Sequence, residues 1–107
     1  MLSDLQNQIN ELIAENSKGA NALFEVEQAL AQAEFDLDTV EQKAFLAAEG
    51  TVADRQAIAK LKAADARLAR DLRKAEYNRV RVKINQIQTA LMALGTQAKL
   101  VHVETNW

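Results

Sequence analysis

The sequence has no cysteine and no proline, only three glycines and few aromatic residues. Without cysteine, the chain can form neither a disulfide framework nor a thiolate metal site. Proline and glycine are the strongest breakers of regular structure, so their scarcity leaves few candidate loops. Good helix formers dominate instead, chiefly alanine, leucine, glutamine, glutamate, lysine and arginine, as is typical of long helices or a coiled coil. The 107 residues are therefore expected to form one all-α domain.

Long apolar runs are also missing. No stretch approaches the roughly 18 consecutive apolar residues that a membrane-spanning helix needs. Residues 1–10 contain neither the basic region nor the apolar region of a signal peptide. We therefore predict a cytoplasmic protein with no membrane partner.

Residue types that carry catalysis are scarce as well. The single histidine, His102, lies near the C-terminal end, and no nucleophile and base can be assembled around it. The sequence contains no glycine-rich phosphate-binding loop and no Glu-x-x-His metal motif. We predict that the protein is not an enzyme and has no cofactor, no metal site and no small-molecule substrate.

The first half carries apolar residues in a three-four rhythm from Leu2 to Ala47. A seam sustained over this length predicts a helix over residues 3–48, packed lengthwise on another helix. Gly19 costs about 1 kcal/mol relative to alanine, so the helix is expected to be weak or kinked there, with a complete break as the alternative. Asn16, also on the seam, either fixes the packing register or faces solvent.

Residues 49–51 predict a tight turn. Gly50 can adopt the left-handed backbone conformation that ends a helix. Thr51 can cap the following helix, and Asp54, three residues later, can complete a variant of the capping box. Because so short a connection between long helices brings them side by side, the turn predicts an antiparallel two-helix hairpin.

The second helix is predicted over residues 52–99. Its seam begins with four apolar residues, Ile58, Leu61, Leu68 and Leu72. A heptad seam in a different phase runs from Tyr77 to Val101, so a stutter is expected between Leu72 and Tyr77. The tail, residues 101–107, lacks helix signals and is expected to be irregular. The predicted fold is thus a coiled-coil-like hairpin that forms one domain over residues 1–107.

A second apolar pattern in the first half recurs every 11 residues, at Leu2, Ile13, Phe24, Phe35 and Leu46. These positions lie roughly 100–140° around the helix from the seam. A single hairpin cannot easily cover both stripes, so the chain is expected to assemble into a helical bundle, most simply as a dimer. The predicted oligomer or partner interface consists of Ile13, Phe24, Phe35 and Leu46. Alternatively, the second stripe only widens the contact with one neighbouring helix.

The two halves of the chain have opposite charge. Residues 1–50 hold two lysines and ten acids, a net charge of −8, whereas residues 51–107 hold eleven basic residues and five acids, a net charge of +6. The basic half either binds nucleic-acid phosphates or pairs with the acidic half. Three pairs equidistant from the turn favour internal pairing: Glu41 with Lys60, Glu34 with Arg67, and Glu27 with Lys74. The candidate nucleic-acid contacts that remain are Arg70, Arg73 and Arg81.

Residues 44–57, AFLAAEGTVADRQA, resemble the turn region of small helical proteins of bacteriophages. An acidic first helix, and a basic second helix near Ala75-Glu76-Tyr77, complete a resemblance that spans roughly residues 34–91. Such proteins are mostly of unassigned function and resemble products of genes near phage replication and recombination genes. The resemblance implies an accessory role in the host-cell cytoplasm, near single-stranded DNA or the proteins that bind and anneal it. It implies no catalytic residue.

The leading hypothesis is therefore a non-enzymatic, oligomeric phage accessory protein that binds partner proteins or single-stranded DNA during replication or recombination. One alternative is an inhibitor of a host nuclease or defence complex that uses its acidic helix as a DNA-like surface. Another is a purely structural coiled-coil module. Salt dependence separates the first two, because direct DNA binding weakens steeply with salt.

Overall fold

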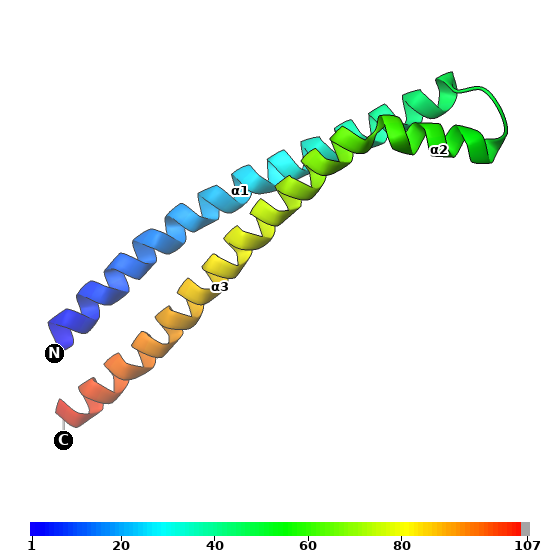
Figure 1. The fold of residues 1–107 in the computed structure, drawn as a ribbon. Helices are drawn as coiled ribbons and strands as arrows, with labels where there is room; N and C mark the ends of the chain where they lie inside the picture. The colour runs from blue at the N-terminus through cyan, green and yellow to red at the C-terminus, as the bar shows by residue number, and fades with distance from the viewer. Residues whose placement is uncertain (106–107) are drawn as a thin grey trace. The chain divides into compact units, whose positions relative to one another are not determined.

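A computed structural model describes the backbone of residues 1–105 and the side chains of residues 1–102. This part of the chain forms three helices and no strand (Figure 1). Helix α1 spans Leu2–Ala47, α2 spans Val52–Lys62 and α3 spans Ala64–Thr105. The predicted all-helical class is confirmed. Within the described residues, no helix is long and apolar enough to cross a membrane.

The helices are shared between two compact units. Unit 1 combines residues 1–24 with the chain from Arg79 onward, and unit 2 is formed by residues 25–78. Both α1 and α3 contribute to each unit, whereas α2 lies in unit 2 alone.

The least exposed face of α1 follows the predicted heptad seam, except at Leu2, Val40 and Ala47, which are exposed. In unit 2, Ala33, Leu37 and Ala44 are buried. In unit 1, the seam positions Asn16 and Gly19 are half-buried. Helix α1 continues without interruption through Gly19, so the alternative of a complete break there is wrong.

Gly19, on the seam of α1, lies close to a side chain of α3. A Cβ atom added at Gly19 would lie 3.0 Å from Cγ1 of Ile84 and 3.6 Å from its Cδ1. By contrast, a Cβ atom added at Gly95, inside α3 in the same unit, would meet no heavy atom within 4 Å. Gly19 therefore leaves room for a side chain of α3, whereas the space beside Gly95 is open within this distance.

Because of this difference, replacement by alanine is expected to have different effects at Gly19 and at Gly95. Gly95→Ala should raise the free energy of unfolding by about 1 kcal/mol, because alanine has the higher helix propensity. Gly19→Ala should gain clearly less, since the new methyl group presses on Ile84. Thermal unfolding followed by circular dichroism measures both changes. In an Ile84→Ala background, the effect of Gly19→Ala should approach that of Gly95→Ala. Equal gains for both glycine variants with Ile84 intact would contradict the close approach.

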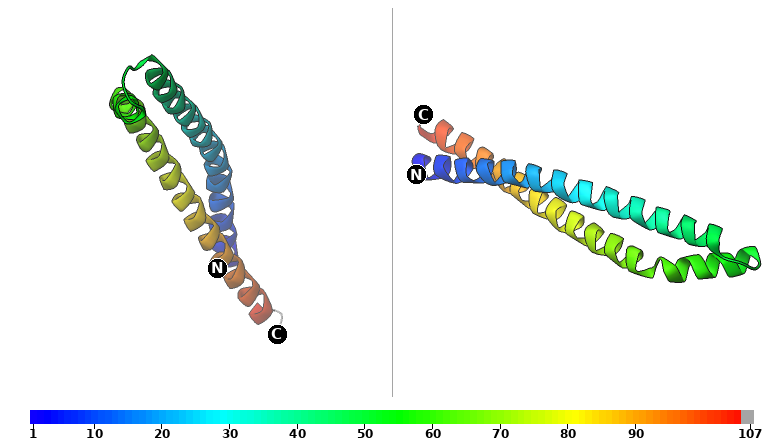
Figure 2. Two further views of the ribbon diagram at one scale, coloured as in Figure 1. Left: turned by 90° about the vertical axis from the view of Figure 1, so that its right-hand side faces the viewer. Right: turned by 90° about the horizontal axis from the view of Figure 1, so that it is seen from above.

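Residues 48–51 connect α1 to α2, and both views in Figure 2 show this non-helical stretch. Gly50 has a positive φ of 112°, a conformation that side chains with a Cβ atom rarely adopt. The Thr51 hydroxyl accepts a hydrogen bond from the Asp54 N–H at 3.2 Å, and the Thr51 N–H donates to the Asp54 carboxylate at 3.3 Å. The predicted capping box is thus confirmed, and it begins α2 at Val52.

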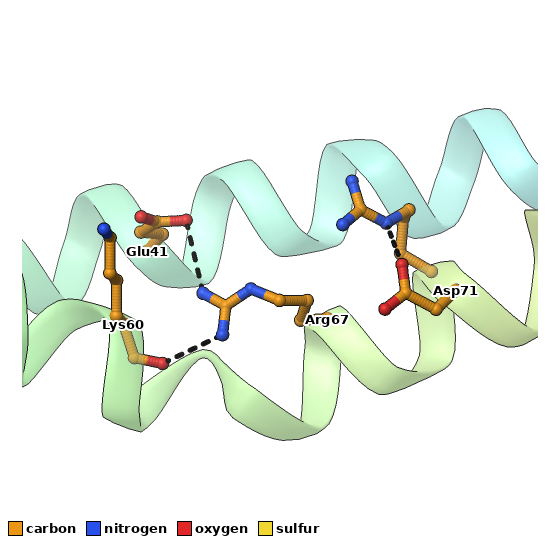
Figure 3. Close-up of polar contacts among 5 residues, drawn as sticks. Glu41, Lys60, Arg67 and Asp71 are labelled. Carbon is orange, nitrogen blue, oxygen red and sulfur yellow. Dashed lines mark hydrogen bonds and ion pairs between the residues drawn. The ribbon is translucent and has the colours of Figure 1, made fainter.

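The second half of the chain is two helices rather than the single helix predicted over residues 52–99. The break falls at Ala63, with φ −89° and ψ 5°. Nη1 of Arg67 donates to the carbonyl oxygen of Lys60 at 3.5 Å, in the last turn of α2 (Figure 3). The Arg67 side chain thus contacts the last turn of α2 at the break, which occurs where the sequence has neither proline nor glycine.

The predicted seam of the second half is wrong before Tyr77. Leu61, Leu68 and Leu72 are exposed, whereas Ala59 and Ala63 are buried at 2% and 0% exposure. The later seam, from Tyr77 to Val101, is confirmed, because Ile87 is buried and the other seam residues are half-buried. Counted back from this seam, the heptad rhythm reaches the two alanines without a change of phase, so the expected stutter is absent from the described residues. The sequence interpretation preferred leucine because of its hydrophobicity. Alanine occupies the contact because a small side chain lets two helices approach closely.

The described part of the tail is helical. Helix α3 continues to Thr105, so the expectation of an irregular segment from residue 101 is wrong for residues 101–105. The lack of helix signals favoured an irregular segment, but this stretch contains neither proline nor glycine to end a helix. Residues 106–107 lie outside the described residues.

Candidate protein-interaction surfaces

The outward face of α1 in unit 2 carries large apolar side chains. Phe35 is 66% exposed and Leu46 is 74% exposed. Phe35 lies two residues from both Ala33 and Leu37, which turns it about 200° around the helix from these buried residues. Phe35 and Leu46 therefore point away from α2 and α3, and the interpretation in which they widen the contact with one neighbouring helix does not hold for them.

The same pattern occupies α1 in unit 1, where Ile13 and Phe24 are also more than half exposed. All four residues of the predicted interface are thus uncovered in the single chain. A side chain of this size gains about 1.5–3 kcal/mol when it is fully buried. These residues are consequently available for contact with another chain, which is the role predicted for them.

A second apolar face, missed in the sequence interpretation, lies on α2 and α3 in unit 2. Leu61 is 78% exposed and lies between the buried residues Ala59 and Ala63, about 200° around the helix from each. Leu68 and Leu72 continue the face and are each more than half exposed. The spacing of these leucines was recognised, but it was assigned to the interior. Continuing the heptad rhythm backward from Tyr77 would have identified the alanine face as the inner one.

The charges do not pair as predicted. Among the described residues, Glu41 forms its ion pair with Arg67, at 4.0 Å, rather than with Lys60 (Figure 3). The pairs predicted for Glu34 and Glu27 do not form in this part of the chain. Side chains on a helix lean toward its N-terminus, so Arg67 reaches back to the level of the Lys60 carbonyl, where it also meets Glu41. Pairs chosen only by their equal distance from the turn do not take this direction of the side chains into account.

Two of the three candidate nucleic-acid contacts, Arg70 and Arg73, form ion pairs with acids of their own helix. Arg70 pairs with Asp71 at 2.7 Å, and Arg73 pairs with Glu76 at 3.1 Å. Both pairs join neighbours on the same helix in unit 2, whereas Arg81 belongs to unit 1. Exposed pairs of this kind contribute little, about 0–1 kcal/mol, so a phosphate group could displace either carboxylate. Within unit 2 the cationic surface is nevertheless interleaved with acids.

One basic residue of the second half of the chain, Arg55, has a specific structural role. The Arg55 Nε–H donates to the carbonyl oxygen of Phe45 at 3.2 Å, and its guanidinium group lies 4.3 Å from the centre of the Phe45 ring. Phe45 is in the last turn of α1, where backbone carbonyls lack helical partners and a cation is favourable. Arg55 thus caps α1 from α2, a contact that no sequence spacing identified.

Two shallow hollows lie beside the helix contact in unit 2. One, of about 330 Å³, is lined by Glu41, Gln42, Phe45, Gln56, Ala59 and Lys60. The other, of about 560 Å³, is lined by four alanines together with Gln32, Asp36, Asp65 and Arg73. Neither lining includes a histidine, serine or threonine that could form a nucleophile–base pair. Among the side chains of residues 1–102, no three histidines or acids gather as a metal site would require.

Among the features of the described chain, the exposed apolar faces are therefore the best candidates for a binding surface. Comparison of this chain with models of protein families, with curated proteins and with solved structures finds no match in any of the three.

Proposed function

We propose that this protein is a non-enzymatic accessory protein that acts by binding other protein chains through outward-facing apolar side chains. The observation that carries the proposal is the exposure of Phe35, Leu46, Leu61 and Leu68 on helices whose inner faces are already packed. Monomeric soluble proteins seldom leave contiguous apolar patches uncovered, and such patches mark interaction sites. We propose that this role belongs to phage DNA replication or recombination, and the support for this is the resemblance of residues 34–91 to small phage proteins.

The proposal includes an antiparallel hairpin as the working form of the chain. Its support is the order of the contacts: Phe45 with Arg55, Glu41 with Arg67, and Gly19 with Ile84. The nearer the first residue of a pair lies to the N-terminus, the nearer its partner lies to the C-terminus. This is the order of contacts in an antiparallel pair of helices. The cysteine-free sequence allows a direct test by oxidative cross-linking of cysteines introduced at Glu41 and Arg67. A cross-link within one chain is expected, and a cross-link between chains alone would contradict the hairpin.

The function is tested by capture from phage-infected cells with the wild-type protein as bait. We expect proteins that bind, anneal or recombine single-stranded DNA, and we expect their recovery to fall when Phe35 and Leu46 are both replaced by glutamine. The matched control replaces Val82 and Met92, exposed apolar residues of α3 in unit 1, by glutamine. Recovery that is unchanged by the first pair of substitutions would contradict binding through this face.

Direct binding of single-stranded DNA would contradict the proposal that the protein acts by binding other protein chains. Fluorescence anisotropy with a labelled oligonucleotide should show no binding that weakens steeply with salt, because the basic residues of unit 2 are interleaved with acids, whose charge repels phosphate groups. Arg70→Gln with Arg73→Gln is compared with Lys18→Gln and Lys43→Gln, which remove the same charge from α1. Salt-sensitive binding that only the arginine pair abolishes would replace protein binding with a nucleic-acid contact.

A further inference from the structure

Unit 2 carries two apolar faces on opposite sides. We define the α1 face as Phe35, Gln42 and Leu46, and the leucine face as Leu61, Leu68 and Leu72. Each set follows the same spacing, seven residues and then four, although the middle position of the α1 face is the polar residue Gln42. The α1 face is about 16 Å long, the rise of 11 residues of continuous helix, whereas the leucine face crosses the break at Ala63. The α1 face points away from α2 and α3, and the leucine face points away from α1.

The two faces lie on helices of opposite charge. Residues 25–49 hold seven acids and one lysine, a net charge of −6, whereas residues 52–78 hold seven basic residues and four acids, a net charge of +3. Within residues 25–78, Glu41–Arg67 is the only ion pair that joins α1 to the helices that follow it. The other acids of α1 in unit 2 have no cation within 4.0 Å, and Lys60, Lys62 and Lys74 have no acid within that distance. Most of this charge is thus left uncompensated by the single chain.

From these observations we infer that the α1 face of one copy of this chain binds the leucine face of a second copy, in a head-to-tail contact. A two-fold contact would place identical faces together. For the α1 face, it would bring two segments of −6 against each other, and for the leucine face, two cationic segments. The head-to-tail contact instead buries Phe35 and Leu46 against the leucine face, between segments of opposite charge. Complementary charge steers association and disfavours the like-charged alternatives.

This inference rests on the proposed function and specifies its oligomeric form. Each copy uses one face of each kind, so the assembly either closes into a ring or grows open-ended. An open assembly leaves one α1 face and one leucine face uncovered at its ends. Those end faces would remain available to the partner proteins of the proposed function.

A complementation experiment tests the arrangement. The α1-face variant carries Phe35→Gln and Leu46→Gln, and the leucine-face variant carries Leu61→Gln and Leu68→Gln. Because these side chains are at least 60% exposed in the single chain, circular dichroism should show unchanged helix content. Sedimentation velocity should show assembly of the wild type. It should also show each variant alone as a monomer of 11.9 kDa, with the assembly concentration raised by more than about tenfold.

Mixing the two variants in equal amounts gives the decisive result. Each mixture partner keeps one intact face, so we expect a species of two chains and nothing larger. A leucine-face variant that still dimerises alone would indicate a two-fold contact through α1, and an α1-face variant that does so would indicate one through the leucines. Either result overturns the inference while leaving the proposed protein binding in place. A wild type that stays monomeric, yet captures partner proteins, would also overturn it.

Salt provides an independent measurement. Raising the salt concentration about tenfold screens charges across an interface. The head-to-tail contact should then weaken, since its charges attract, whereas a two-fold contact through α1 should strengthen as repulsion is screened. Control substitutions at Val82 and Met92 should leave the assembly and its salt dependence unchanged. An assembly that strengthens with salt would contradict the complementary charge on which the inference depends.

Discussion

Replacement of Ala59 by leucine is expected to lower the free energy of unfolding by about 2–3 kcal/mol. Ala59 is 2% exposed and lies on α2, where it lines a hollow together with Glu41 and Phe45 of α1. A leucine at this position must either separate the helices or turn into this hollow through an unfavourable rotamer. For a chain of this size, the loss corresponds to a melting temperature lower by roughly 10–20 °C.

The control for this substitution is Ala57→Leu in the same helix. Ala57 is exposed and lies two residues away, so its change should stay within about 0.5 kcal/mol. Chemical unfolding at low protein concentration separates stability from assembly. Equal costs at the two positions would contradict the alanine contact. Ala63→Leu, at a site with 0% exposure, should repeat the result for Ala59.

The second large effect is expected at Arg55, whose replacement by alanine should cost about 2 kcal/mol. The change removes a charged hydrogen bond to the Phe45 carbonyl, typically worth about 1.5–3 kcal/mol. It also removes the contact with the Phe45 ring, worth about 0.5–1 kcal/mol at an exposed site. Arg55→Lys should lose less, because lysine keeps the charge at the end of α1 but lacks the planar guanidinium group.

A double-mutant cycle with Phe45→Leu divides these contributions, because leucine keeps the backbone carbonyl and removes only the ring. Arg55→Ala should therefore remain costly in the Phe45→Leu background. Arg70→Ala, which breaks an exposed pair with Asp71, provides a control that should cost less than about 1 kcal/mol. If Arg55→Ala is no more costly than Arg70→Ala, Arg55 does not cap α1.

Local chemistry made the connection between α1 and α2 predictable. Gly50, Thr51 and Asp54 are close together in sequence, and their conformations depend mainly on short-range sterics and hydrogen bonds. The same holds for the helical class, which follows from the near absence of residues that break helices. The seam of α1 was also predictable, since its apolar rhythm keeps one phase over the whole helix.

Charge pairing and the second helix were harder to predict. Arg67 reaches Glu41 only because its side chain leans back along its helix and bonds the Lys60 carbonyl where α2 ends. Arg55 reaches Phe45 across the connection, over ten positions of sequence. Such contacts depend on where two helices lie relative to each other within the unit, and no periodic pattern encodes that distance.

The sequence by itself determined that the chain is helical, where its first helix ends and its second begins, and which stripe of α1 faces inward. Propensity, capping and a periodic apolar pattern act within a few helical turns, so they can be read from neighbouring residues. The second half carries two apolar rhythms, one of leucines and one that reaches Ala59 and Ala63 from the later seam. The tertiary structure decided between them and placed the alanines on the inner face. Hydrophobicity ranks leucine above alanine, but the close approach of two packed helices admits only the smaller side chain. The leucines are thereby left on the outside, where they form a surface for another chain.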